Sequence, residues 1–228
     1  MIYHTYISAK KAKLIDRLIV ATDDMRVYDV CEEYGIDCHL TPDDINTGTD
    51  RAAFAASELT GADIIVNIQG DEPFISGNMI DQAIEPLLFD SNVKVSTLIK
   101  KIILLEELFS PATVKVVFDM HNFAIYFSRS PIPFVRDEND FEKNIQAGYY
   151  YKHIGLYVFR AKSLFKFSSL PASDLEQIEK LEQLRLIENG IKMKVVETTY
   201  NSISVDTPED LERAREHYYQ LPDDRKAE

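Results

Sequence analysis

A short run of β-forming residues that ends abruptly constrains the fold more than any other feature of the chain. Residues 64–68 read Ile-Ile-Val-Asn-Ile and lead directly into the sequence QGDEP at residues 69–73. Such a largely apolar run is typical of a strand that is buried on both faces of a sheet. Because open α/β sheets bind ligands beyond the carboxyl ends of their strands, Asp71 is expected at the edge of a crevice. An acidic turn after a core strand is the ordinary alternative.

The rest of the chain alternates between helical and strand patterns. Helices are expected at residues 2–13, 23–34, 48–58, 78–88, 161–170, 174–189 and 208–219. Strands are expected at residues 17–21, 38–40, 64–68, 94–100, 114–118, 123–128, 153–159 and 193–197, and residues 130–148 are expected to form a loop. This order is typical of the strand–helix–strand units of a parallel sheet.

We therefore predict an α/β protein with a mostly parallel sheet that is flanked by helices. Residues 1–220 are expected to form a single domain, in which residues from about 110 to 160 form a smaller inserted lobe of strands. The last eight residues, 221–228, are expected to be a frayed tail.

Charge and cysteine content exclude several classes of function. The net charge of −13 over 228 residues would repel nucleic acid and anionic membrane surfaces. Cys31 and Cys38 form no CxxC pattern, which favours a reducing compartment. The chain has no apolar run near the roughly 20 residues of a membrane span and no signal-peptide core. We therefore expect a cytoplasmic protein that binds neither nucleic acid nor membranes.

Asp206 is the second candidate carboxylate. It lies in SVDTPED at residues 204–210, where Thr207 and Pro208 are typical of a helix start. Asp206 could therefore belong only to that helix start. If it meets Asp71 across a crevice, the two carboxylates would bind a hard cation such as Mg²⁺, which prefers oxygen ligands and shares its shell with phosphates.

Two further segments have the composition of ligand-binding turns. TGTDR at residues 47–51 precedes a predicted helix, whose first N–H groups favour polar or anionic atoms, and Gly48 permits close approach. Arg129 follows a predicted strand beside a proline-rich loop, where a guanidinium can bind a carboxylate through two hydrogen bonds. A capped helix and a surface arginine are the alternatives.

Two other segments place polar side chains on predicted elements. Strand alternation puts His153, Gly155 and Tyr157 on one face, which suggests either a sugar pocket or a half-buried face with satisfied polar groups. The predicted helix at residues 174–189 has an apolar stripe of Leu175, Ile178, Leu181 and Leu184 and an i,i+4 pair of Glu176 with Lys180. Three side chains of this helix are expected to face solvent unless a ligand lies nearby: Glu179, Glu182 and Gln183.

Together these segments resemble the 3-deoxy-manno-octulosonate (KDO) cytidylyltransferases, or CMP-KDO synthetases. The matching stretches follow the family's order over nearly the whole chain: ATDD (21–24), TGTDR (47–51), VNIQGDEPFI (66–75), VKVVFD (114–119), YFSRSPIP (126–133), YKHIGLYVFR (151–160), LEQLR (181–185) and VDTPEDLERA (205–214). The resemblance implies a Rossmann-like nucleotidyltransferase fold and a homodimer in which the lobe mediates dimerisation. The implied reaction joins CTP and KDO into CMP-KDO and pyrophosphate for lipopolysaccharide biosynthesis.

The same resemblance implies roles for individual residues. Asp71 and Asp206 would be catalytic and would hold Mg²⁺, and Arg129 would bind the KDO carboxylate. The KDO hydroxyls would be bound by His153, Tyr157, Glu182 and Gln183. The CTP site would be lined by Gly48, Thr49, Arg51 and Gln69.

The start of the chain departs from the family pattern. Family members begin with a strand and a loop resembling PARxxSxRxPGKP, roughly 25 to 30 residues by analogy and about one βα unit, before a helix near MIYHTY. The sequence begins at that helix. We therefore expect Met1 to be an internal methionine of a longer reading frame. The alternatives are a non-catalytic remnant that binds sugar or nucleotide or only dimerises, and a cytidylyltransferase for a related acidic sugar.

Overall fold

The computed structural model describes residues 1–45, 47–59, 61–205 and 207–220, and the expected tail at 221–228 lies outside this part. Its helices are α1 (Ile2–Ala9), α2 (Met25–Glu33), α3 (Gly48–Ser57), α4 (Gly77–Phe89), α5 (Leu105–Phe109), α6 (Phe141–Gln146), α7 (Ala161–Ser169), α8 (Asp174–Glu179), α9 (Leu184–Glu188) and α10 (Pro208–Gln220). Its strands are β1 (Val20–Thr22), β2 (Cys38–Leu40), β3 (Ile64–Ile68), β4 (Val95–Lys101), β5 (Lys115–Phe118), β6 (Ala124–Ser128), β7 (Tyr151–Arg160) and β8 (Met193–Glu197). None of the described helices is long and apolar enough to cross a membrane.

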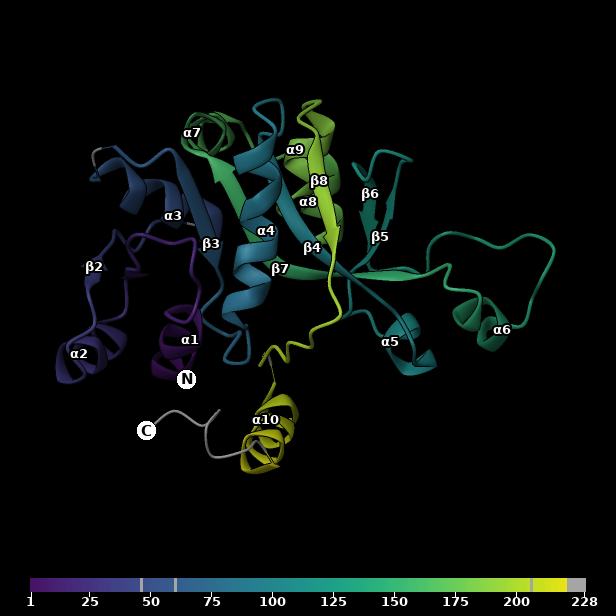
Figure 1. Cartoon of the computed structure of the whole chain (residues 1–228), viewed down its shortest axis with the longest axis horizontal. Helices are drawn as coiled ribbons and strands as arrows, with labels where there is room; N and C mark the ends of the chain where they lie inside the picture. Colours follow the sequence, from purple (N-terminus) through teal and green to yellow (C-terminus); the bar gives the residue numbers. More distant parts are fainter. Residues whose placement is uncertain (46, 60, 206, 221–228) are drawn as a thin grey trace.

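The sheet is organised around the ten-residue strand β7 (Figure 1). Strands β3, β4 and β5 all pair antiparallel with β7, and β8 pairs parallel with β4. Strands β1 and β2 form a separate parallel pair beside this sheet. The predicted α/β class is confirmed, and the sheet is mixed because β7 runs against its neighbours.

Two hydrophobic cores cover the two faces of the sheet. On one face, side chains of α3, α7, α8 and α9 pack against Tyr157 and Phe159 of β7. On the other face, α1 and α4 pack against Leu156 and Val158 of the same strand. Successive side chains of a strand point to opposite faces, so β7 contributes to both cores. This central position explains why β7 can carry site residues on a rigid scaffold.

The predicted helix at residues 174–189 is wrong. The chain forms two short helices, α8 and α9, because Lys180 adopts a left-handed conformation with φ of 54°. The apolar stripe also fails, since Ile178 is 76% exposed whereas Glu176 is only 8% exposed. Glu176 binds Arg185 instead of its expected partner Lys180. A buried ion pair therefore determines this segment, and helical periodicity does not.

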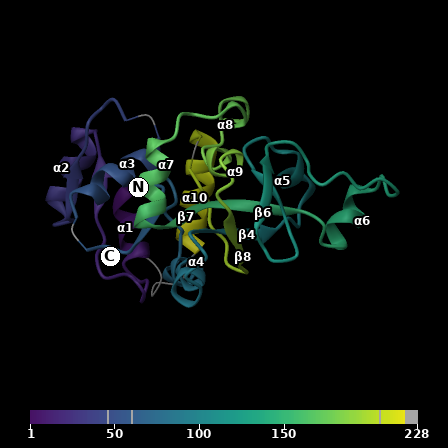
Figure 2. The same ribbon diagram turned by 90° about the horizontal axis from the view of Figure 1, so that it is seen from above.

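The expected loop at residues 130–148 contains the helix α6, which the sequence did not predict. Asp140 caps it by accepting hydrogen bonds from the backbone N–H groups of Glu142 and Lys143. Helix α5 lies near α6, where the rings of Phe109 and Phe141 meet edge to face at 4.8 Å. Figure 2 shows α5, α6 and β6 at one end of the molecule, with β7 leading from them into the sheet, and β5 pairs with β6 there (Figure 1). We call these four elements and their connections, residues 102–150, the arm.

Candidate active site at the carboxyl edge of the sheet

The QGDEP turn follows β3 and lies against β7. The backbone N–H of Glu72 donates to the carbonyl of Gln69 at 3.2 Å and closes the turn. A Cβ atom placed on Gly155 would lie 3.6 Å from Cδ of Gln69 and 3.7 Å from Oε1 of Glu72. Side chains of this turn therefore lie beside Gly155, and the gap expected between His153 and Tyr157 is closed because the two rings meet.

The segment before α10 runs beside the same turn. The backbone N–H of Val205 donates to the carbonyl of Asp71 at 2.9 Å. The hydroxyl of Ser202 donates to the carboxylate of Glu72, which is 7% exposed. Asp206, the expected second metal ligand, lies outside the described residues, and its preceding residue is in contact with Asp71. Within the described part of the chain, no three His, Cys, Asp or Glu side chains are grouped to hold a metal ion.

His153 and Tyr157 form the polar side of β7 above this turn. Their ring centroids are 5.3 Å apart. The Tyr157 hydroxyl donates to Oε1 of Gln183 at 3.1 Å, and Gln183 is 3% exposed. Burial raises the pKa of Tyr157 and lowers that of His153 to about 3, so both side chains are uncharged at neutral pH.

The hydrogen bonds around Thr97 assign the tautomer of His153. The Thr97 hydroxyl donates its single proton to the carbonyl of Leu156 at 2.7 Å. Its oxygen lies 2.8 Å from Nε2 of His153 and must accept the proton of that nitrogen. Nδ1 of His153 is then a hydrogen-bond acceptor, which suits a sugar hydroxyl.

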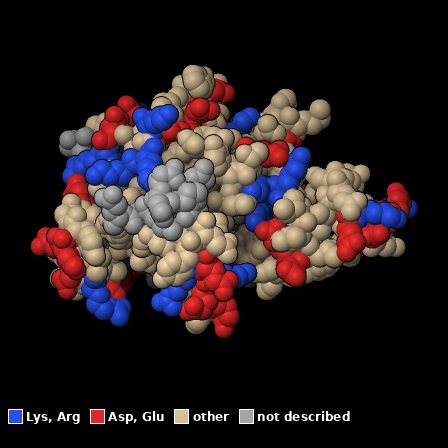
Figure 3. All heavy atoms as spheres, turned by 60° about the horizontal axis from the view of Figure 1, so that its bottom comes forward, with Lys and Arg blue, Asp and Glu red and all other residues tan. Residues whose placement is uncertain are grey.

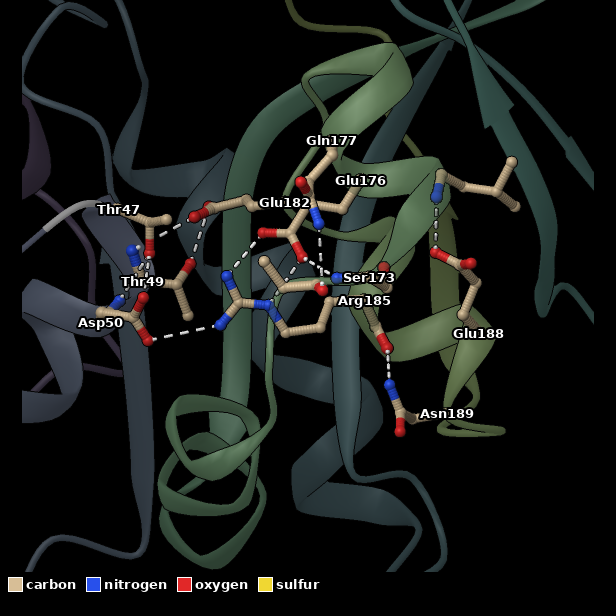
Figure 4. A network of polar contacts seen from close by, with 12 residues as sticks. Thr47, Thr49, Asp50, Ser173, Glu176, Gln177, Glu182, Arg185, Glu188 and Asn189 are labelled. Carbon is tan, nitrogen blue, oxygen red and sulfur yellow. Dashed lines mark hydrogen bonds and ion pairs between the residues drawn. The ribbon is translucent and has the colours of Figure 1, made fainter.

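The TGTDR segment begins α3 and contacts the segment between α8 and α9 (Figure 4). Thr47 caps the helix by accepting from the backbone N–H of Asp50 at 3.1 Å. The Thr49 hydroxyl donates to Oε1 of Glu182 at 2.7 Å and accepts from Nδ2 of Asn67 at 3.1 Å. Burial raises the pKa of Glu182, although hydrogen bonds from Thr49 oppose the shift. Gln183 is thus buried and Glu182 half-buried, unlike the solvent-facing positions expected in the absence of a ligand.

Gly48 and Arg51 of this segment face different surroundings. Gly48 is exposed, and a Cβ atom placed there would meet no atom within 4 Å, so a ligand can approach its backbone. The Arg51 guanidinium instead binds the loop before α3. It donates to Oδ2 of Asp23 at 2.9 Å, to the Thr41 hydroxyl, and to the carbonyls of Pro42 and Ile45 at 3.4 Å each.

Arg129 lies at the end of β6 against the break between α8 and α9. Its guanidinium donates to the carbonyls of Glu179, Lys180 and Pro111 at 2.8, 3.3 and 2.6 Å. These bonds use three of the five N–H groups of a guanidinium, which leaves two for a ligand. Burial raises the pKa of Glu179, but hydrogen bonds from the backbone of Arg129 and from Ser128 and Tyr126 outweigh it and lower the pKa overall.

Lys115 adds a second cation beside Arg129. Its side chain is buried, and its ammonium donates to the carbonyls of Ser110 and Thr113 at 2.9 and 2.6 Å. Burial and the charge of Arg129 lower the pKa of Lys115, whereas Glu179 opposes the shift. Two cations and one carboxylate leave an excess positive charge here, which favours an anionic ligand.

The structure brings most of the predicted residues into one set of contacts. Gln69 and the Asp71 turn lie against β7, Tyr157 binds Gln183, and Glu182 binds Thr49. Arg129 joins this set through Phe127, whose ring centroid is 5.1 Å from that of His153. Sequence reasoning missed four buried or bonded charged side chains: Lys115, Glu176, Glu179 and Arg185. Lys115 was signalled by its place in an otherwise apolar strand and Arg185 by its place four residues after Leu181 of the apolar stripe, whereas Glu176 lies off that stripe and gave no such signal.

Comparisons with known proteins agree with this geometry. A family model described as "Cytidylyltransferase" matches residues 1–195. A 3-deoxy-manno-octulosonate cytidylyltransferase of Pelobacter propionicus is 49% identical over 222 residues, covering 96% of the chain and 87% of the relative. The relative of the same name from Geobacter sulfurreducens is 47% identical over 220 residues, covering 95% and 88%.

Solved structures give the same result. A CMP:2-keto-3-deoxy-manno-octonic acid synthetase complexed with CTP matches with a TM-score of 0.87 and 37% identity, covering 96% of the chain and 87% of that structure. A 4-diphosphocytidyl-2C-methyl-D-erythritol synthase from Anaerococcus prevotii, with a TM-score of 0.60 and 17% identity, shares the fold alone. The Rossmann-like nucleotidyltransferase fold expected from the resemblance is confirmed. The chain belongs to the 3-deoxy-manno-octulosonate cytidylyltransferase family.

Proposed function

We propose that the protein transfers the cytidylyl group of CTP to KDO and releases pyrophosphate. The observation that carries this proposal is the 49% identity, over 96% of the chain, to a relative named for this activity. In the reaction, the anomeric hydroxyl of the sugar loses its proton and forms a bond to the α-phosphorus. The bond from that phosphorus to the β-phosphate oxygen breaks, and pyrophosphate leaves with the electron pair. Such transfers depend mainly on alignment and electrostatic stabilisation.

The polar face of β7 is the proposed sugar site. Nδ1 of His153 accepts a hydrogen bond from a sugar hydroxyl. The Tyr157 hydroxyl and the Gln183 amide, which are hydrogen-bonded to each other, lie beside it. Glu182 extends this surface towards α3. Arg129 binds the sugar carboxylate with its two remaining N–H groups, supported by the excess positive charge that Lys115 contributes.

The start of α3 is the proposed nucleotide site. Gly48 and Thr49 lie at the N-terminal end of a ten-residue helix. The N–H groups of Thr49 and Asp50 donate to Glu182 and Thr47, so the exposed backbone of Gly48 is the part that the polar atoms of a nucleotide can approach. Gln69 is the first residue of the turn after β3. Arg51 supports this site by holding the loop before α3 in place, because its hydrogen bonds go to that loop and to Asp23.

Asp71 and Asp206 are the proposed holders of Mg²⁺. The hydrogen bond from Val205 to the Asp71 carbonyl supports this pairing, because it brings the residue before Asp206 against Asp71. Carboxylate oxygens suit Mg²⁺, and a site with few protein ligands is completed by water and substrate phosphates. When bound, the cation would offset the negative charge of the triphosphate.

We also propose that the chain is a single domain and that its arm binds a second copy of the chain. The arm comprises most of the lobe expected at residues from about 110 to 160, together with the helix α5 that precedes it. Large apolar side chains on the arm are exposed: Ile103 by 68%, Leu104 by 53%, Phe109 by 52%, Phe134 by 83% and Tyr149 by 51%. Charged side chains of both signs are interspersed over the face shown in Figure 3, with uncharged surface between them. Exposed apolar side chains gathered at one end of the molecule favour an interface, and a homodimer would cover them.

The first test is pyrophosphate release by the purified chain with CTP, KDO and Mg²⁺, with Asp71→Ala as the inactive control. Release that requires KDO and disappears in the control supports the proposal. Release with another acidic sugar but not with KDO would assign a related substrate. A folded chain that releases no pyrophosphate with any sugar acid contradicts the proposed transferase.

A further inference from the structure

Arg185 is a buried cation outside the proposed substrate contacts. It is 5% exposed and lies in α9, two residues after Gln183. Its Nε donates to Oε2 of Glu176 at 2.8 Å and its Nη2 donates to Oε1 at 2.5 Å (Figure 4). This two-bond arrangement fixes the orientation of both side chains and joins α8 to α9 across the break at Lys180.

The same guanidinium also reaches two other elements. Its Nη1 lies 3.6 Å from Oδ1 of Asp50 in α3, and its central carbon lies 4.3 Å from the ring centroid of Phe167 in α7. Oδ1 of Asp50 accepts no hydrogen bond within the described part of the chain, so the ion pair with Arg185 is its main compensation. A lysine has a single ammonium and cannot reproduce the planar arrangement that meets Glu176, Asp50 and the ring together.

Both proposed substrate sites depend on atoms that this cation holds. Oδ2 of Asp50 accepts from the Thr47 hydroxyl at 2.8 Å and thereby shapes the turn that begins α3. Thr49, in the same turn, donates to Glu182. The backbone N–H of Arg185 donates to the carbonyl of Glu182 at 3.1 Å. Arg185 thus touches the segment that carries Glu182 and the acidic residue of the opposite turn.

The charges explain why the arrangement requires a cation. Three carboxylates, those of Glu176, Asp50 and Glu182, surround one guanidinium, and they raise its pKa, with the hydrogen bonds to Glu176 as the largest cause. Asp50 and Glu182 repel each other, which contributes to the raised pKa of Glu182. Without Arg185, the hydrogen bonds from Thr49 to Glu182 would have to hold the start of α3 against this repulsion.

We propose that Arg185 is a positioning residue that couples the nucleotide turn at the start of α3 to the sugar-binding segment of residues 181–186. Binding of CTP at the turn then orders the segment that presents Glu182 and Gln183 to the sugar acid. The proposal rests on the proposed function for the identity of the two sites. Coupling between sites is typically worth a 5- to 150-fold effect.

Hydrogen–deuterium exchange of the full chain with and without CTP tests this coupling. In the wild type, CTP is expected to slow amide exchange at residues 181–186 by at least about fivefold. Arg185→Lys keeps the charge and loses the planar contacts, so the CTP-dependent slowing at 181–186 should disappear while slowing at the start of α3 remains. Arg17→Lys is the matched control, because Arg17 forms an exposed ion pair with Asp37 at 2.8 Å; it should behave as the wild type.

Asp50→Asn is the second variant, because it keeps the pair of Arg185 with Glu176 and removes only the charge facing α9. Asp50→Asn should also abolish the CTP-dependent slowing at residues 181–186. Because the pair of Arg185 with Glu176 is intact in this variant, such a result could not be explained by loss of that pair. Slowing that persists in both variants, or a wild type in which CTP leaves residues 181–186 unchanged, overturns the proposal. Pyrophosphate release by the wild type decides the sugar separately: coupling without release from KDO rejects the proposed substrate and leaves the coupling standing.

Discussion

The carboxyl edge of the sheet and the arm distribute their side chains in opposite ways. At the edge, polar and charged groups are buried and bonded, as Gln183 and Glu176 show with exposures of 3% and 8%. On the arm, large apolar groups are exposed, as Phe134 shows with 83%. Each arrangement opposes the usual distribution of a globular protein, because buried polar groups must be paired and exposed apolar surface is unfavourable. The difference is the one expected if, as proposed, the edge binds small ligands and the arm binds a second protein surface.

The largest effect is expected from Asp71→Asn at the edge, compared with Asp137→Asn on the arm, where the Asp137 side chain is 97% exposed. Stabilisation by a bound metal ion is worth several kcal/mol and each 1.4 kcal/mol is tenfold in rate, so kcat/KM should fall about a thousandfold in the first variant. Steady-state assays of both variants measure this. Equal activity in the two would remove Asp71 from the reaction.

Protonation of His153 should make the edge sensitive to acid. Its folded-state pKa is about 3 and lies below the ordinary value of 6.5, so the folded state binds fewer protons than the unfolded state as pH falls through this window. Stability is therefore lost with falling pH, by up to about 1.4 kcal/mol per pH unit. Urea unfolding at pH 6 and pH 5 measures this loss, which should be smaller in His153→Gln. His121→Gln changes an exposed residue of the arm, and its free energy of unfolding should depend on pH as that of the wild type does.

Tyr157→Phe tests the bond between β7 and the segment after α8. The change removes the hydroxyl that donates to Gln183 and leaves a buried amide oxygen without that partner. Such a loss costs about 1–3 kcal/mol, so the KM for KDO should rise about tenfold while the KM for CTP changes little. Two-substrate kinetics give both constants, and a rise confined to the CTP constant would contradict the placement of the sugar site.

Phe134→Asp is expected to change assembly on the arm with little effect on the folded monomer. The ring of Phe134 is exposed, so surface substitution should alter the free energy of unfolding of the monomer by less than about 0.5 kcal/mol. Light scattering after gel filtration should show a dimer for the wild type and a shift to monomer in the variant. A wild type that is monomeric at all concentrations would contradict the proposed dimer.

Local patterns in the sequence predicted most elements of the sheet domain. The strand at Cys38–Leu40 and the starts of α3 and α10 follow from β-forming residues and from caps such as Thr47. These signals act within a few residues, so they can be recognised without knowledge of the fold. The direction of β7 could not be found in this way, because parallel and antiparallel strands have similar residue patterns when both faces are buried.

Prediction failed where a distant partner determined the local structure. The helix expected at residues 174–189 breaks at Lys180, where Glu179 binds the end of β6 and Glu176 binds Arg185. A periodic sequence cannot show that a charged side chain will be buried, since the compensating partner comes from another element. The candidate site shows the same limit: Tyr157 and Gln183 were both predicted as site residues, but their hydrogen bond was not.

The sequence by itself determined the α/β class, the family and the residue types available for binding a nucleotide and an acidic sugar. The tertiary structure decided which of these residues meet: Glu182 with Thr49, Arg129 with the break at Lys180, and Arg185 with Asp50 and Glu176. The physical reason is the cost of burying charge. A carboxylate or guanidinium stays buried only where a partner and hydrogen bonds compensate it, and the packing of separate elements supplies those partners.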